Sequence, residues 1–210
     1  MTAALFAEIF DEVGAPPGIF NLVHGLGGDA GQAIVEHPDV KLVSFTGGTT
    51  TGRRVAATAA PMFKKLSLEL GGKNPTVVFA DADFDEAVQG TARAGFANQG
   101  QICLCGSRIL VERSIHDKFV EALVKQVTGL KVGDPSHPDT DIGSLVSLGH
   151  REKVEGYVKL AGEEGGTIVA GGQRPELSDG NTGGAFLLPT IVTGLDPNCR
   201  TSTEEIFGPV

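Results

Sequence analysis

The sequence predicts an α/β fold in which helices flank parallel sheets. Short apolar runs that suit strands alternate with segments whose apolar residues recur at helical spacing. This β-α-β alternation is typical of parallel strands with helices packed on the sheet. The 30 glycines cluster at the junctions between these segments, which fits a fold with many tight turns.

Residues 1–71 contain three predicted strands that alternate with helices. Apolar residues at helical spacing predict a first helix over residues 2–13, which Gly14 and the proline pair that follows it end. The predicted strands cover residues 19–23, 40–45 and 65–70. A glycine turn at 25–29 precedes a helix that ends near His37, and the glycine-rich segment 46–52 leads into a helix that ends at Ala59.

Residues 72–210 are expected to form a second domain. Its predicted elements, in order, are a strand at 76–79, a helix at 81–96, a strand at 108–112, helices at 115–130 and 149–164, and strands at 167–170 and 186–192. Ser114 is the predicted N-cap of the helix 115–130, whose apolar stripe consists of Phe119, Leu123 and Val127. Pro189 interrupts the last strand, and a polar loop is predicted over residues 176–184.

Composition argues against several classes of function. The net charge of −9 without a basic cluster argues against a nucleic-acid partner. No apolar run approaches the ~18–20 residues of a membrane span, and the acidic N-terminal segment does not resemble a signal peptide. Three cysteines, an odd number, argue against a disulfide framework and favour a reducing, cytoplasmic compartment. Cys103 and Cys105 lack further ligands nearby and the five histidines are scattered, so we expect no metal site.

Glu69 and Cys103 are the candidate catalytic pair. A thiolate is a strong nucleophile that can form a covalent acyl intermediate, and a carboxylate can activate the water that hydrolyses it. Cys103 follows Glu69 by 34 positions (103 minus 69), so only the fold can bring the two side chains together. The alternative is structural: a lone cysteine is usually inert packing, and a glutamate before Gly-Gly is usually only a strand end.

Two stretches around these residues carry a family resemblance. LELGGKNP (68–75) and FANQGQICLCGS (96–107) resemble, over their whole length and in order, the glutamate and cysteine motifs of the aldehyde dehydrogenase superfamily. FTGGTTTG (45–52) and EEIFGPV (204–210) extend the resemblance over practically the entire chain. The resemblance implies an aldehyde dehydrogenase-like fold. Residues 1–71 would be the C-terminal half of a Rossmann-like NAD(P)-binding domain, and residues 72–210 would be most of the catalytic domain.

The resemblance also implies cofactor contacts. Glycine turns at helix N-termini suit phosphate groups in general, but such turns are common and neither one here is GxGxxG. By position in the family, Gly27 and Gly31 would lie near the adenosine, and Glu205 and Phe207 would hold the nicotinamide ribose and ring. The family prefers serine where this chain has Gly48, so only backbone contact can remain there. The other implied contact residues are Phe45, Gly47, Thr51, Gly52, Leu70 and Gly71, and more weakly His150 and Lys153.

The implied reaction is oxidation of a small-molecule aldehyde to a carboxylic acid with NAD or NADP. Cys103 would form a thiohemiacetal and then a thioester, which water activated by Glu69 would hydrolyse. The context around Cys103 and Cys105 resembles the branch that oxidises 2-aminomuconic and 2-hydroxymuconic semialdehydes. Two alternatives stay open: a coenzyme A-acylating enzyme, which usually lacks the carboxylate at the position of Glu69, and an inactive dinucleotide-binding or structural relative.

Members of the family are longer than this chain. We therefore expect the 210 residues to be a fragment of a larger parent. The family's oxyanion-hole asparagine and its adenosine-ribose lysine would lie upstream, so the fragment alone is expected to have little activity. The parent is expected to form a homodimer or homotetramer.

Overall fold

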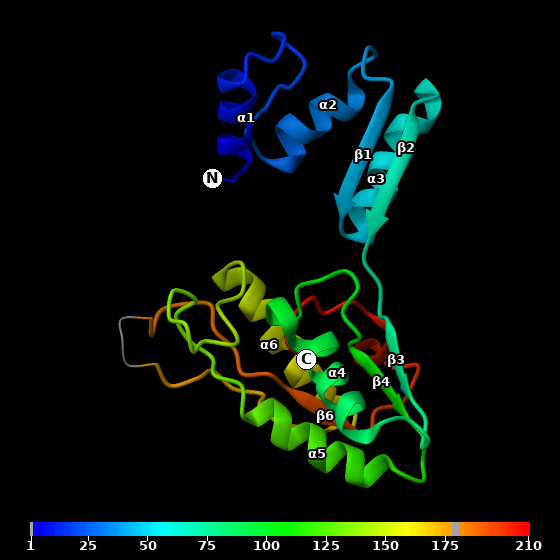
Figure 1. Ribbon diagram of the computed structural model, residues 1–210. Helices are drawn as coiled ribbons and strands as arrows, with labels where there is room; N and C mark the ends of the chain where they lie inside the picture. Colours follow the sequence, from blue (N-terminus) through cyan, green and yellow to red (C-terminus); the bar gives the residue numbers. More distant parts are fainter. Residues whose placement is uncertain (1, 178–180) are drawn as a thin grey trace. The chain divides into compact units, whose positions relative to one another are not determined.

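The computed structural model describes residues 2–177 and 181–210. The chain divides into two compact units, Met1–Leu70 and Gly71–Val210, shown in Figure 1. Among the described residues, the first unit has one two-stranded sheet and one buried cluster of apolar side chains, and the second unit has two of each. Within the described ranges, no helix combines the length and the apolar character that a membrane span requires.

The first unit is built on a parallel pair of strands. Strands β1 (Leu42–Gly47) and β2 (Lys65–Leu70) pair in parallel, with α3 (Thr49–Ala59) as the connecting helix. Helix α3 packs on both strands (Figure 1). A short helix, α2 (Gln32–Glu36), follows a single π-helical turn at Gly27–Gly31. The core consists of Val35, Val43 and Val55.

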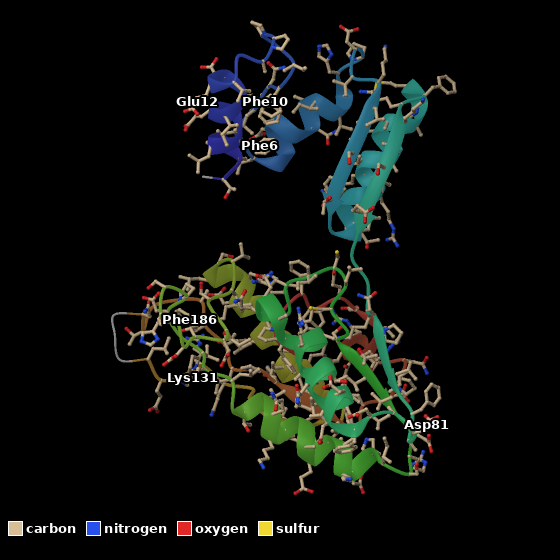
Figure 2. All side chains as sticks on the ribbon, in the orientation of Figure 1. Phe6, Phe10, Glu12, Asp81, Lys131 and Phe186 are labelled. Atoms are coloured by element: carbon tan, nitrogen blue, oxygen red, sulfur yellow. The ribbon has the colours of Figure 1, made fainter. Side chains whose placement is uncertain are left out.

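The predicted strand at residues 19–23 is wrong. This stretch is irregular and lies against α1 (Thr2–Glu12) instead of in a sheet. The ring of Phe20 stacks on the ring of Phe10, with centroids 4.9 Å apart, and also meets the ring of Phe6 edge-on. Figure 2 labels both α1 phenylalanines. A β-strand is held by backbone hydrogen bonds to a neighbour, and the structure records no strand partner for this stretch.

The second unit begins with a β-α-β arrangement. Strands β3 (Pro75–Val78) and β4 (Arg108–Val111) are parallel, and α4 (Phe84–Phe96) connects them. Helix α4 packs on α5 (His116–Thr128), whose Phe119, Leu123 and Val127 form the predicted stripe and are at most 2% exposed. The side chain of Asp83 caps α4, so this helix starts later than predicted.

The predicted cap of α5 is also wrong. Ile115 occupies the N-cap position, and no side chain caps this helix. The hydroxyl of Ser114 instead donates a hydrogen bond of 2.6 Å to the carboxylate of Glu112. Ser114 thus lies one position before the N-cap, and its side chain bonds to Glu112 instead of to the first turn of α5.

The remainder of the second unit packs around α6 (Leu148–Glu163). Strands β5 (Thr167–Ala170) and β6 (Ile191–Thr193) form an antiparallel pair, followed by the short helix α7 (Arg200–Thr203). The predicted strand 186–192 is therefore reduced to its end, because Pro189 lacks an N–H for a sheet. Leu187 is instead buried beside Val154 in the apolar cluster under α6. The predicted polar loop 176–184 lies partly outside the described residues.

Candidate active site

Cys103 lies in an exposed turn that follows α4. The turn is preceded by three residues with left-handed backbone, Asn98 (φ 49°), Gln99 (φ 58°) and Gly100 (φ 67°). Left-handed conformations are uncommon for residues other than glycine, and strained backbone of this kind clusters at functional sites. A β-carbon at Gly100 would overlap the carbonyl of Gly208, so this approach of two backbones requires glycine. The strained segment therefore ends α4 sharply and leads into the cysteine turn.

The turn leaves the backbone N–H of Cys103 free. The N–H of Cys105 donates to the carbonyl of Ile102 at 3.0 Å, which fixes the peptide group between Ile102 and Cys103. Because that peptide group is planar and trans, its N–H points away from its carbonyl. Among the described residues, no acceptor is recorded for this N–H. When a thiolate adds to a carbonyl carbon, the carbonyl oxygen becomes an oxyanion. A free N–H on the residue that carries the thiol can stabilise this oxyanion.

Asn74 ties the same turn to the sheet. Its side-chain amide donates to the carbonyl of Cys103 at 2.6 Å and to the carbonyl of Cys105 at 3.2 Å. Asn74 immediately precedes β3, and its own carbonyl accepts a bond from the N–H of Arg108 at 3.2 Å. Sequence reasoning missed this role, although Asn74 belongs to the LELGGKNP stretch.

The three cysteines differ in their surroundings. Cys103 is exposed, whereas Cys105 is only 6% exposed and burial raises the pKa of its thiol. Cys199 is partly buried, and its Sγ donates to the hydroxyl of Ser202 at 3.3 Å. Because the thiolate is the reactive form, burial and a raised pKa both make Cys105 a poor nucleophile. Its exposure makes Cys103 the best candidate nucleophile of the three cysteines.

The two adjacent glutamates near the C-terminus have different partners. The carboxylate of Glu204 accepts bonds from Arg200 at 2.9 and 3.0 Å and from the hydroxyl of Tyr157 at 2.6 Å. The guanidinium of Arg200 is the main reason that the pKa of Glu204 is lowered. The carboxylate of Glu205 has no hydrogen bond within the described residues, and it lies against the α-carbon of Gly71. Glu205 is therefore available to a ligand, and Glu204 is not.

Phe207 and two residues of α6 complete this group. Phe207 has left-handed backbone (φ 61°), and its side chain is partly exposed. His150 bonds to the carbonyl of Phe207 at 2.6 Å through Nε2, and the two rings meet edge-on. Lys153 donates to the carbonyl of Glu205 at 3.4 Å. The structure thus brings His150 and Lys153 to the segment that holds the predicted ribose and nicotinamide contacts.

In the first unit, most predicted site residues gather at the carboxyl ends of β1 and β2. Glu69 pairs in register with Thr46, and Leu70 with Gly47. Gly48 is the N-cap of α3, and the start of that helix packs so closely on β2 that a β-carbon at Gly52 would overlap the side chain of Leu70. Ligands of open α/β sheets bind beyond the carboxyl ends of the strands. The residues in this group are Phe45, Gly47, Gly48, Thr51, Gly52, Glu69 and Leu70.

Two predicted features stand apart from these groups. Gly27 and Gly31 lie in the π-helical turn, which packs on α2 and leaves open space at both glycines. Glu69 and Cys103 belong to different units, so their pairing stays a prediction.

In residues 2–177 and 181–210, no group of three or more histidine, cysteine, aspartate or glutamate side chains has the geometry to hold a metal ion.

Comparison with known proteins places this chain in a family. The model of the aldehyde dehydrogenase family matches residues 1–210. The chain belongs to the aldehyde dehydrogenase family. It is 48% identical over its whole length to the 2-aminomuconic 6-semialdehyde dehydrogenase of a Pseudomonas species and to the human 2-aminomuconic semialdehyde dehydrogenase. It is also 48% identical to the 2-hydroxymuconic semialdehyde dehydrogenase of Pseudomonas putida.

A solved aldehyde dehydrogenase has the same fold. The betaine aldehyde dehydrogenase of Staphylococcus aureus, crystallised with NAD⁺, superposes on the whole chain with a TM-score of 0.96 at 44% identity. The predicted aldehyde dehydrogenase-like α/β fold is therefore confirmed. The chain spans 43–44% of the length of the semialdehyde dehydrogenases named above and 41% of the S. aureus enzyme.

Proposed function

We propose that the protein to which this chain belongs oxidises an aldehyde to a carboxylic acid, with Cys103 as nucleophile and Glu69 as general base. The observation that carries this proposal is the exposed Cys103 in a turn that leaves its own N–H free. Cys105 lies two residues away but is buried. Membership of the aldehyde dehydrogenase family over the whole chain supports the same reaction.

Cys103 performs the covalent part of the reaction. Its thiolate attacks the aldehyde carbon and forms a C–S bond, and the carbonyl oxygen becomes an oxyanion that the N–H of Cys103 stabilises. Loss of hydride from the same carbon leaves a thioester on Cys103. Glu69 then takes a proton from water, the water oxygen attacks the thioester, and the C–S bond breaks. The acid leaves and the thiolate is restored.

Taken separately, each unit has residues that fit part of a nicotinamide dinucleotide. NAD, when bound, accepts the hydride. The first N–H groups of α3 lack helical partners and Gly48 leaves space before them, which suits the pyrophosphate. The unpaired carboxylate of Glu205 suits the two hydroxyls of a ribose, and the partly exposed ring of Phe207 suits the planar nicotinamide. Gly27 and Gly31, in their open turn, would lie by the adenosine.

The proposed substrate is a muconic semialdehyde. The support is the 48% identity to 2-aminomuconic and 2-hydroxymuconic semialdehyde dehydrogenases from bacteria and animals. We also propose a cytoplasmic, homo-oligomeric parent. Three free cysteines in the described chain support a reducing compartment.

Formation of reduced nicotinamide by the full-length protein tests the reaction and its branch. We expect turnover with 2-hydroxymuconic semialdehyde to exceed turnover with a simple aliphatic aldehyde, and coenzyme A to leave the rate unchanged. A reaction that requires coenzyme A would mean that a thiol, and not water, accepts the acyl group. That result would contradict the role of Glu69. No turnover with any aldehyde would support an inactive relative. The 210-residue chain, assayed beside the parent, is expected to show little activity.

A further inference from the structure

Asn74 holds the cysteine turn in shape, and we propose that it is a positioning residue for aldehyde oxidation. This inference rests on the proposed function of Cys103. The side-chain amide of Asn74 fixes the carbonyls of Cys103 and Cys105, and so holds in place the backbone that carries the Cys103 thiol. Asn74 itself need not touch the substrate.

The anchor is rigid. Asn74 is partly buried at the point where β3 begins, and its backbone carbonyl receives the N–H of Arg108, where β4 begins. Its backbone is therefore fixed by the parallel pair of strands, whose residues Pro75 and Arg108 are in register. A residue on a rigid strand can hold a loop more precisely than another loop residue can.

The side chain is matched to its two acceptors. A primary amide has two N–H donors, and Asn74 directs them to the carbonyls of Cys103 and Cys105, at 2.6 and 3.2 Å. These two carbonyls belong to residues two positions apart, so a single side chain from another part of the chain holds both of them. Because each peptide group is planar, a fixed Cys103 carbonyl also fixes the orientation of the peptide group between Cys103 and Leu104.

The segment around Cys103 has few contacts of its own with the rest of the fold. Around Cys103 the backbone bonds are local, from Cys105 N–H to Ile102 and from Ser107 N–H to Cys105, and the N–H of Gly106 donates to the carbonyl of Ala94 in α4 at 3.0 Å, which anchors the far end of the turn. The side chain of Leu104 is 81% exposed and that of Ile102 is 36% exposed, so apolar packing contributes little on either side of Cys103, whereas Cys105 at the end of the turn is buried. Within residues 2–177 and 181–210, Asn74 is the side chain that bonds to the carbonyls of Cys103 and Cys105 from another element.

Two variants of the full-length protein test the proposal. Asn74→Ala removes both donors, and Asn74→Asp keeps the shape but presents acceptors to two carbonyls. We expect kcat to fall by roughly 10²-fold in both, because a displacement of about 1 Å costs that much, while KM for aldehyde and cofactor changes less than about threefold. Asn21→Ala is the matched control. It removes a side-chain bond to the carbonyl of Gly18, far along the chain from Cys103.

A second readout does not depend on turnover. Hydrogen exchange of a peptide covering residues 101–107 is expected to accelerate at least about tenfold in Asn74→Ala, because the variant loses both hydrogen bonds from the Asn74 side chain. A peptide covering β4 is expected to exchange as in the unchanged protein. Equal acceleration in both peptides would mean general destabilisation and would overturn a positioning role, as would a kcat within twofold of the unchanged protein.

The Cys103→Ala variant separates the two proposals. If this variant retains turnover, the proposed function is wrong. If it loses turnover while Asn74→Ala and Asn74→Asp keep theirs, the proposed function stands and the inference about Asn74 is wrong. If all three lose kcat and residues 101–107 alone exchange faster, the inference holds.

Discussion

The carboxylate of Glu205 lies directly against the α-carbon of Gly71, although 134 positions (205 minus 71) separate them. A β-carbon on Gly71 would overlap all three atoms of that carboxyl group. Because a side-chain end can rotate, the Gly71→Ala variant should fold but displace the carboxylate. We expect KM for NAD to increase by about tenfold or more, the value of one lost hydrogen bond to a charged group, with kcat changed less.

Gly72→Ala is the matched control for that prediction. A β-carbon on Gly72 would meet only the side-chain oxygen of Asn74 at 3.5 Å, which is an ordinary contact. Steady-state kinetics of the two full-length variants would show the difference. An equal increase of KM in both would mean that the Gly-Gly segment, and not the carboxylate of Glu205, responds to the added methyl group.

Acid stability should depend on Glu164. Its carboxylate accepts the backbone N–H groups of Arg200 and Thr201, both at 3.0 Å, at the start of α7. The hydroxyl of Thr201 beside it is the main cause that lowers the pKa of Glu164 from 4.5 to about 2, with these N–H groups adding to the effect. A lowered carboxyl pKa stabilises the folded state above pH 4.5, and this stabilisation is lost as the pH falls towards 2.

The Glu164→Gln variant should remove this part of the pH dependence. Tyr157 is the one tyrosine of the chain and lies on α6, so its fluorescence follows unfolding of the second unit. We expect the gap in urea midpoint between the unchanged protein and the variant to be full near pH 6 and to close between pH 4.5 and pH 2. A gap that is constant over this range would contradict the role of the Glu164 charge.

Alkaline stability should depend on Lys73. This residue lines a cavity of about 270 Å³ together with Arg108. Burial, and then the charge of Arg108, lower the pKa of Lys73 from 10.5 to about 8. Below pH 8 the folded protein therefore contains a poorly solvated cation. Between pH 8 and 10.5 the folded state binds fewer protons than the unfolded state, so its stability increases with pH.

Replacing the cation should remove that dependence. The Lys73→Met variant is expected to be more stable at pH 7, by on the order of 2–3 kcal/mol, and to lose the rise in stability above pH 8. Urea unfolding followed by circular dichroism would measure both effects. A variant that is less stable at pH 7 would show that the ammonium of Lys73 has a partner that stabilises it.

Alkylation should distinguish the two neighbouring thiols. Cys103 is exposed, whereas Cys105 is buried and has a raised pKa. At pH 7.5 to 8, we expect iodoacetamide to modify Cys103 at least about tenfold faster than Cys105, because reaction requires an accessible thiolate. Peptide mapping by mass spectrometry would give both rates. Similar rates would mean that the turn opens readily and that burial does not protect Cys105.

The sequence alone led to the fold class and to the central thiol. The motif FANQGQICLCGS placed Cys103 after a helix, and the structure has it in an exposed turn after α4. The alternation of apolar runs predicted the parallel pairs β1–β2 and β3–β4, because the periodicity of a segment depends on local sequence. The prediction of a strand at residues 19–23 was wrong because a strand also needs a neighbouring strand to pair with. Phe20 in this stretch stacks on Phe10 instead.

Other parts of the candidate site depend on contacts that no local pattern reveals. The side chain of Asn74 donates hydrogen bonds to residues 29 and 31 positions away along the chain. In the sequence, an asparagine before proline is by itself an ordinary turn residue. His150 and Lys153 reach the Glu205–Phe207 segment because they are three apart on one face of α6. Glu69 and Cys103 belong to different units, and their pairing stays a prediction.

The measurement that tests the central claim most directly is turnover of the full-length protein beside its Cys103→Ala and Cys105→Ala variants. The absorbance of reduced nicotinamide would be followed with 2-hydroxymuconic semialdehyde as substrate. We expect Cys103→Ala to lose at least about 10⁴-fold in kcat, because the covalent route is removed, and Cys105→Ala to retain most of its activity. Turnover that survives in Cys103→Ala, or that disappears only in Cys105→Ala, would contradict the assignment of Cys103 as the nucleophile.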